Sequence, residues 1–138
     1  MNDATIGFIK QWLLKANEDL LVVERLTDYE IVATSSVCFH CQQAVEKFLK
    51  AFLIANGVDI KKTHNIEYLL SECSEIDKDF SDIDPKELSD FSVDVRYPGD
   101  MYIPNEDETL EYKNLAFKIK DFVEKKIDKI LKSKEKPG

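Results

Sequence analysis

The chain has 138 residues, which fits one domain, because single hydrophobic cores typically occupy about 100 to 150 residues. Hydrophobic residues make up 43% and charged residues 33%, while Gly and Pro number four each, so the composition excludes a disordered or low-complexity chain. The formal net charge of −8 argues against a surface that coats nucleic acid, which normally needs a basic domain.

No stretch of the sequence approaches the roughly 20 apolar residues that cross a bilayer, and the N-terminus lacks a basic segment followed by an apolar run. We therefore expect a cytoplasmic protein without membrane contact. The three cysteines, Cys38, Cys41 and Cys73, are an odd number, and two of them lie inside an apolar helical pattern. This placement predicts reduced, buried thiols.

Two long helices are predicted in the first half of the chain. From Thr5 to about Thr27, apolar residues recur at three- and four-residue steps, which is the pattern of an amphipathic helix. The segment 27–30 interrupts this pattern, and a second helix is predicted from about Val32 to Ala55. Asn56-Gly57 would end it, because Gly accepts the left-handed conformation that closes a helix.

Shorter helices are predicted next. Thr63 is positioned to cap a third helix that carries Ile66 to Cys73, and a polar connector follows from Ser74 to Asp82. Asp84-Pro85 is typical of a helix start, since Pro is favoured at the first helical position. A fourth helix is therefore predicted from there to about Val95.

A last long helix is predicted from about Glu106 to Lys132, after a break that Pro98, Gly99 and Pro104 enforce. The tail from about residue 132 is expected to fray. The sequence thus predicts an all-α fold: an antiparallel up-down bundle of four main helices plus a short extra helix, in one domain covering residues 1–138.

Charge is spread unevenly along the chain. Between Glu72 and Glu111 there are fourteen acids against three bases, whereas from Lys118 to the end there are eight Lys against four acids. An ordinary solvated loop region followed by a lysine-faced helix would account for this distribution.

The second helix carries a polar stripe. At about 100° per residue, Ser36, His40, Gln43, Lys47 and Lys50 share one sector of it. An imidazole, an amide and two ammonium groups could hold a phosphate or another anion. The alternative is a stripe that faces water or supports a helix dimer.

Nothing in the sequence indicates a cofactor. Metal binding is disfavoured as well, because His40, Cys41 and Cys38 do not share one direction on the helix and no second cluster completes a tetrahedral set.

A family resemblance runs through several motifs in fixed order. The run from Phe39 to Ala51 contains Gln-Gln-Ala-Val-Glu-Lys, and it is followed by Lys62-Thr63-His64 and later by Arg96-Tyr97-Pro98. With Trp12 to Leu20 in the first helix, this pattern resembles the HEPN domain family over nearly the whole chain up to Pro98. The resemblance implies a helical bundle that is commonly a homodimer and is often encoded beside a minimal nucleotidyltransferase.

The wider HEPN family includes metal-independent ribonucleases, whose motif is an Arg followed by a His, with four to six residues between them. Arg96 matches the Arg, but the positions where the His is expected hold Met101, Tyr102 and Ile103. Met and Ile cannot exchange a proton, and Tyr, with an ordinary pKa of about 10, is a poor general base at neutral pH. We therefore assign no catalytic residue, although His64 or His40 could substitute in space.

The sequence favours a non-catalytic HEPN-like domain that binds a nucleotide, RNA or a nucleotidyltransferase partner through a polar groove. Arg96 would supply a planar fork for phosphate, unless it forms a salt bridge with Asp94 or Asp100. The residues assigned to binding are His40, Gln43, Lys47, Lys50, His64, Arg96 and Tyr97.

Two other readings compete with this one. The first is a divergent ribonuclease toxin of a toxin-antitoxin pair, and the second is an interaction module with no site. A symmetric homodimer is expected, with the second and last helices at the interface and with Arg96 and Lys47 of both subunits lining one cleft.

Overall fold

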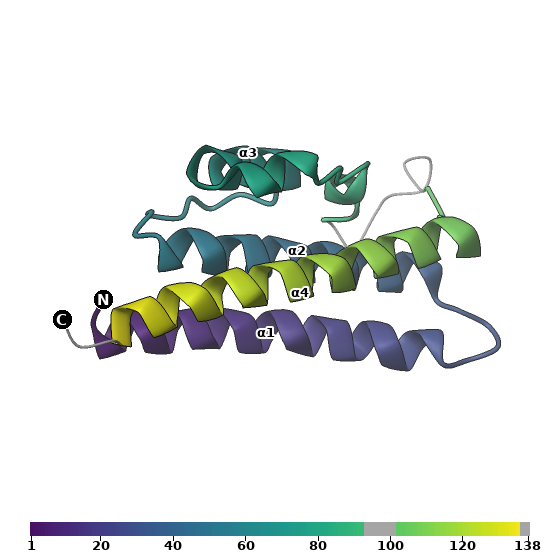
Figure 1. The fold of residues 1–138 in the computed structure, drawn as a ribbon. Coiled ribbons are helices and arrows are strands. Elements are labelled where there is room, and N and C mark those ends of the chain that lie inside the picture. The colour runs from purple at the N-terminus through teal and green to yellow at the C-terminus, as the bar shows by residue number, and fades with distance from the viewer. Residues whose placement is uncertain (93–101, 136–138) are drawn as a thin grey trace.

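The computed structural model describes residues 1–92 and 102–135, and the regular structure in these ranges is entirely helical (Figure 1). Four α-helices and two short 3-10 helices follow one another as α1 (Asp3–Thr27), α2 (Thr34–Ala55), α3 (Ile66–Ile76), η1 (Lys78–Asp82), η2 (Leu88–Phe91) and α4 (Glu106–Glu135). The predicted all-α bundle is confirmed.

Helix α2 is the centre of the bundle. It packs against α1 on one side, against α3 and η2 on another, and against α4 (Figure 1). Its apolar positions at helical spacing are buried, namely Val37, Cys41, Ala44, Val45, Phe48 and Phe52, and no residue from Ser36 to Ala55 is highly exposed. Because neighbours surround α2, even its polar positions lie at helix contacts rather than on open surface.

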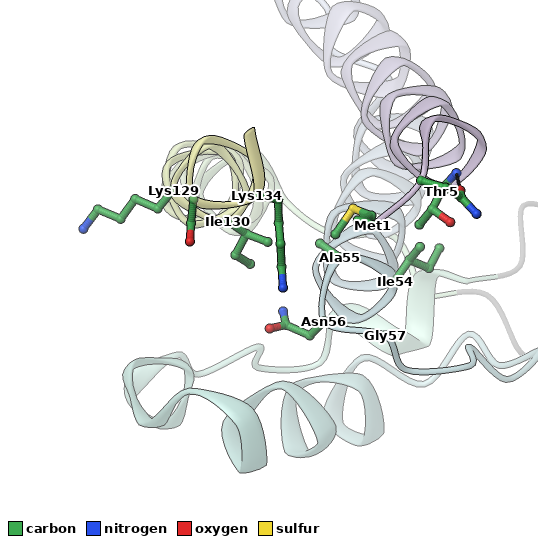
Figure 2. Close-up of a pocket in the computed structure, with 11 residues that line it drawn as sticks. Met1, Thr5, Ile54, Ala55, Asn56, Gly57, Lys129, Ile130 and Lys134 are labelled. Atoms are coloured by element: carbon green, nitrogen blue, oxygen red, sulfur yellow. Dashed lines mark hydrogen bonds between the residues drawn. The ribbon is translucent and has the colours of Figure 1, made fainter. Parts of the chain in front are cut away.

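The helix directions follow from the lengths of the connections. The start of α1 and the ends of α2 and α4 meet around one open hollow (Figure 2). The short loop between α1 and α2 makes these two helices antiparallel. Helices α2 and α4 are separated by the much longer stretch of residues 56–105. Helix α4 begins at the end of the bundle where α2 also begins, so these two helices run in the same direction (Figure 1).

The cap of α3 differs from the prediction. The Asn65 side chain, not that of Thr63, accepts a hydrogen bond from the helix, namely from the backbone N–H of Tyr68 at 2.9 Å. The Thr63 hydroxyl instead accepts from the backbone N–H of Asn65 at 3.1 Å. Thr63 therefore stabilises the turn before α3, and Asn65 caps the N-terminus of the helix.

The predicted polar connector contains an anchor that the sequence reading missed. Within η1, Phe80 is buried, and its ring lies 4.5 Å from that of Phe52 in α2 and 4.9 Å from that of Phe122 in α4. One aromatic residue thus attaches an otherwise polar segment to the core.

The prediction of a fourth helix starting at Asp84-Pro85 is wrong within the described residues, since only the four-residue η2 forms there. The Asp84 carboxylate accepts from the backbone N–H of Lys86 at 2.9 Å, and Lys86 has a φ of 52°. This local turn competes with helix formation, and a left-handed residue cannot continue an α-helix. The predicted end of this helix, Val95, lies outside the described residues.

All three cysteines are buried and free, as predicted. Burial raises the pKa of the Cys38 thiol to about 11 and that of the Cys73 thiol to about 12, so both are protonated at neutral pH. Among the described helices, none is long and apolar enough to cross a membrane.

Candidate functional site

The polar stripe of α2 lies between α1 and the loop that precedes α3. We call His40, Gln43, Lys47 and Lys50 of α2, together with His64 of that loop, the polar strip. Of these five residues, only His64 is highly exposed, with 67% of its side chain accessible, whereas Lys50 is buried. The position of α2 inside the bundle explains why most of the strip is partly covered.

A carboxylate from α1 neutralises one end of the strip. Asp19 Oδ2 accepts from Lys47 Nζ at 2.6 Å, and Asp19 Oδ1 lies 2.9 Å from His40 Nδ1. Asp19 itself is 9% exposed. A carboxylate this covered needs such partners, because an unpaired buried charge is costly. Lys47 is therefore bound within the molecule.

A second carboxylate, Glu46 of α2, holds the other end. Its Oε2 accepts from Lys50 Nζ at 2.9 Å, and its Oε1 lies 2.7 Å from His64 Nδ1. Burial would raise the pKa of the Glu46 carboxyl, but the hydrogen bonds from Lys50, His64 and Gln42, with the charge of Lys50, outweigh it and lower this pKa. Glu46 is therefore ionised at neutral pH.

Two glutamines connect the loop to the middle of the strip. Gln42 Nε2 donates to Glu46 Oε1 at 3.2 Å and to the backbone carbonyl of His64 at 3.1 Å. Gln42 Oε1 accepts from Gln43 Nε2 at 2.7 Å. This chain of bonds fixes the loop against α2, so that the His64 ring has a defined orientation.

Aromatic side chains border the strip. Lys50 Nζ lies 5.7 Å from the centre of the Trp12 ring, and Phe8 packs edge-on against Trp12 with ring centres 6.0 Å apart. Phe8 is 46% exposed, while Trp12 and Phe39 are partly buried. The surface thus combines paired charges with accessible aromatic area.

The structure brings together five of the seven predicted site residues, namely the five that form the polar strip. The two lysines among them differ from the prediction, because both are bound to carboxylates of the same chain. Arg96 and Tyr97 lie outside the described residues.

Tyr102 is described and exposed, and its hydroxyl donates to the Glu108 carboxylate. This hydrogen bond raises the pKa of Tyr102 to about 12, which makes its phenolate still rarer at neutral pH.

Sequence reasoning did not assign Asp19, Gln42 or Glu46 to the site. One signal for Asp19 was present: it is an acid set among buried positions of α1, next to Leu20. A charged residue in a buried row usually has a partner. Gln42 gave no such signal, because the loop that it binds is distant in sequence.

Fold and site together define a small helical bundle with a polar strip between its first two helices. The model of the HEPN family, described as the HEPN domain, matches residues 9–126, and the chain therefore belongs to the HEPN domain family. Neither a curated protein nor a solved structure matches the chain. In the described residues, no group of three or more His, Cys, Asp or Glu side chains is arranged to hold a metal ion.

Proposed function

We propose that the protein is a non-catalytic HEPN domain that binds a partner protein through the polar strip, and that this partner is a minimal nucleotidyltransferase. The observation that supports this choice is the pairing of Lys47 with Asp19 and of Lys50 with Glu46. RNA or a free nucleotide would have to compete with these carboxylates for the cations.

The strip also resembles a protein interface in composition. Its charges are balanced, its exposed groups include the His64 ring, and Phe8, Trp12 and Phe39 add aromatic area beside it. Protein interfaces are enriched in aromatic residues and depleted of unpaired charge at their centres. Paired charges and aromatic area suit binding of a folded protein better than binding of a phosphate chain, which needs unpaired cations.

Isothermal titration with a purified minimal nucleotidyltransferase tests the proposal. The wild type should bind, and Gln43→Arg should weaken binding by about tenfold or more, because it puts an unpaired bulky cation at the centre of the strip. Lys132→Ala on α4 serves as a control and should bind like the wild type. No binding by the wild type would refute the proposal.

Titration with ATP and with a short RNA oligonucleotide distinguishes the other ligands. The proposal predicts no binding of either ligand alone at micromolar concentration. If a nucleotide binds and Gln43→Arg abolishes that binding, then the strip is a nucleotide site, and the protein-partner assignment is wrong.

One observation favours a second candidate function, a divergent ribonuclease toxin. The exposed His64 ring is oriented by the buried Glu46 carboxylate through a 2.7 Å contact at Nδ1, which leaves Nε2 for proton transfer. Cleavage of single-stranded RNA that is lost in His64→Ala and kept in His40→Ala would support this function. RNA left uncut by the purified wild type would exclude it.

A further inference from the structure

An open groove runs along one side of α4, between this helix and residues 79–84, which follow α3. Two hollows form the groove, and they share Lys118 and Phe122, so the groove is continuous. It extends along α4 from Leu115 to Lys129, which is roughly 21 Å at a rise of about 1.5 Å per residue. Its lining residues all differ from those of the polar strip, so the groove is a separate surface.

The floor of the groove is apolar. Four side chains form it, one from the segment after η1 and three from successive turns of α4, namely Ile83, Leu115, Ile119 and Phe122. Ile119 is buried, whereas the other three are partly buried and pack against the core. The exposed part of these three side chains is apolar area that a bound molecule could cover.

The two sides of the groove carry opposite charge. The side formed by η1 and the residues after it, which we call the acidic rim, has three exposed acids, namely Asp79, Asp82 and Asp84. The side formed by α4, which we call the basic rim, has three exposed lysines, namely Lys118, Lys125 and Lys129. One acid, Asp121, lies beside these lysines, so the net charge of that side is positive. A molecule in the groove therefore meets acids on one side and bases on the other.

The charges of the two rims do not neutralise each other. Lys118 lines the same hollow as the three acids, yet among these described side chains it forms an ion pair with none of them. The other two members of the basic rim likewise form no ion pair with a described side chain. A neighbouring lysine, Lys126, does reach η1, where it binds Asp77 and Asp79 at 2.6 and 2.9 Å. The groove thus keeps apart opposite charges that a bound molecule could join.

Stabilisation of α4 itself explains little of the basic rim. Cations stabilise the last turn of a helix, but this effect does not extend beyond the terminal turns, and Lys118 and Lys125 lie in the middle of α4. The three lysines follow one another at steps of seven and four residues, which is the spacing at which one helix meets another. The rim therefore has the form of one side of a helix–helix contact.

We propose that the groove docks an amphipathic helix of a partner protein. This helix has apolar residues on the face toward Phe122, acids along the edge at the basic rim and bases along the edge at the acidic rim. A helix can present such a face and both edges from one short segment. An added strand would need an open sheet edge, and the structure describes no strand in residues 1–92 and 102–135. The opposite rims also fix the direction of the helix, because turning it end for end would bring like charges together.

A segment of mixed charge is the occupant that both rims favour. A nucleic acid or another polyanion would gain contacts with the basic rim, but it would lie against the acidic rim, and the net charge of −8 on the whole chain would repel it. A purely basic segment would in turn lie against the lysines. Because the groove shares no residue with the polar strip, this inference does not depend on the proposed function.

Fluorescence anisotropy with a labelled synthetic helix tests the proposal. The first peptide has about 18 residues, or roughly five turns, with Leu at steps of three and four, Glu along one edge, Lys along the other and Ala elsewhere. It should bind the wild-type chain, and Lys125→Glu/Lys129→Glu should weaken binding by about tenfold or more, because attractive contacts become repulsive. Circular dichroism checks that each variant is folded.

Two further variants locate the binding. Asp82→Lys, on the acidic rim, should also weaken binding of the first peptide, by about threefold or more, because it places a base against the basic edge. The control Lys10→Glu/Lys62→Glu has the same net charge as the lysine variant but changes exposed positions elsewhere, so it should bind like the wild type.

A matched exchange of charges provides the decisive measurement. In a second peptide, Lys replaces Glu along the acidic edge. This peptide should bind Lys125→Glu/Lys129→Glu more tightly than the wild type by about tenfold, because its new lysines then meet the new glutamates.

Three outcomes would overturn the proposal. One is a wild type that does not bind the first peptide at concentrations up to about 1 mM. Another is equal binding of that peptide by the wild type and by Lys125→Glu/Lys129→Glu. The third is binding of a peptide with Glu along both edges at least as tight as that of the first peptide, which would make the groove a site for polyanions.

Discussion

The polar strip of α2 and the outer face of α4 contain similar residues in different surroundings. Both carry lysines at helical spacing, but in the strip Lys47 and Lys50 are bound to Asp19 and Glu46. On the outer face of α4, by contrast, Lys118, Lys125 and Lys129 are exposed and form no ion pair with a described side chain. The difference comes from burial, because a covered cation must be neutralised and an exposed one is hydrated. A basic stripe therefore indicates an anion site only where it is exposed.

The largest expected effect on stability concerns the buried ion pair between Glu46 and Lys50. Glu46→Ala should lower the free energy of unfolding by about 3 to 5 kcal/mol, because it leaves the buried Lys50 without its counterion. Chemical denaturation monitored by circular dichroism measures this change. Glu111→Ala, which breaks the exposed pair with Lys86, is the matched control and should cost less than about 1 kcal/mol. Equal losses in the two variants would mean that Glu46 is not buried with Lys50.

A smaller effect is expected at the other end of the strip. Asp19→Asn should cost about 1 to 3 kcal/mol, since the amide keeps the shape of the carboxylate but loses its charge-assisted bonds to Lys47 and His40. The double variant Asp19→Asn/Lys47→Met should recover part of this loss, because no cation is then left unpaired. A double variant less stable than the single one would contradict this coupling.

A pH dependence should accompany Glu46. Its pKa in the folded state is lowered from an ordinary value of 4.5, so the unfolded chain binds more protons as pH falls through that range. The stability that Glu46 contributes is present above about pH 4.5 and is lost as pH falls toward the folded pKa. Denaturation midpoints measured between about pH 6 and about pH 3 should show a weaker pH dependence in Glu46→Gln than in the wild type. Identical slopes would contradict the lowered pKa.

The smallest effect on stability is expected at the exposed lysines of α4. Lys125→Glu/Lys129→Glu should change the free energy of unfolding of the monomer by less than about 0.5 kcal/mol per residue, because these side chains are exposed and make no described ion pair. Thermal unfolding of the variant and of the wild type at the same protein concentration measures this change. A loss as large as that of Asp19→Asn would show that these lysines stabilise the fold.

Particular residues show how far sequence reasoning reached. The three long helices were predicted within a few residues, because Ala16, Phe48 and Ile119 belong to rows whose spacing records burial on one side of a helix. The helix after Pro85 was predicted wrongly, because the Asp84 side chain bonds to the backbone of Lys86 and the chain turns there. The spacing of apolar residues gives little indication that a side chain will bond to the backbone and so prevent a helix.

By itself, the sequence determined the all-α class, the helix faces and the HEPN motifs, because these depend on the order of residues along single helices. Only the tertiary structure decided which charges of the polar strip are free. Asp19 meets Lys47 across two helices, and Glu46 meets His64 across a loop. Such contacts depend on how α1, α2 and the loop before α3 pack together. The strength of each electrostatic interaction depends on how far that packing excludes water.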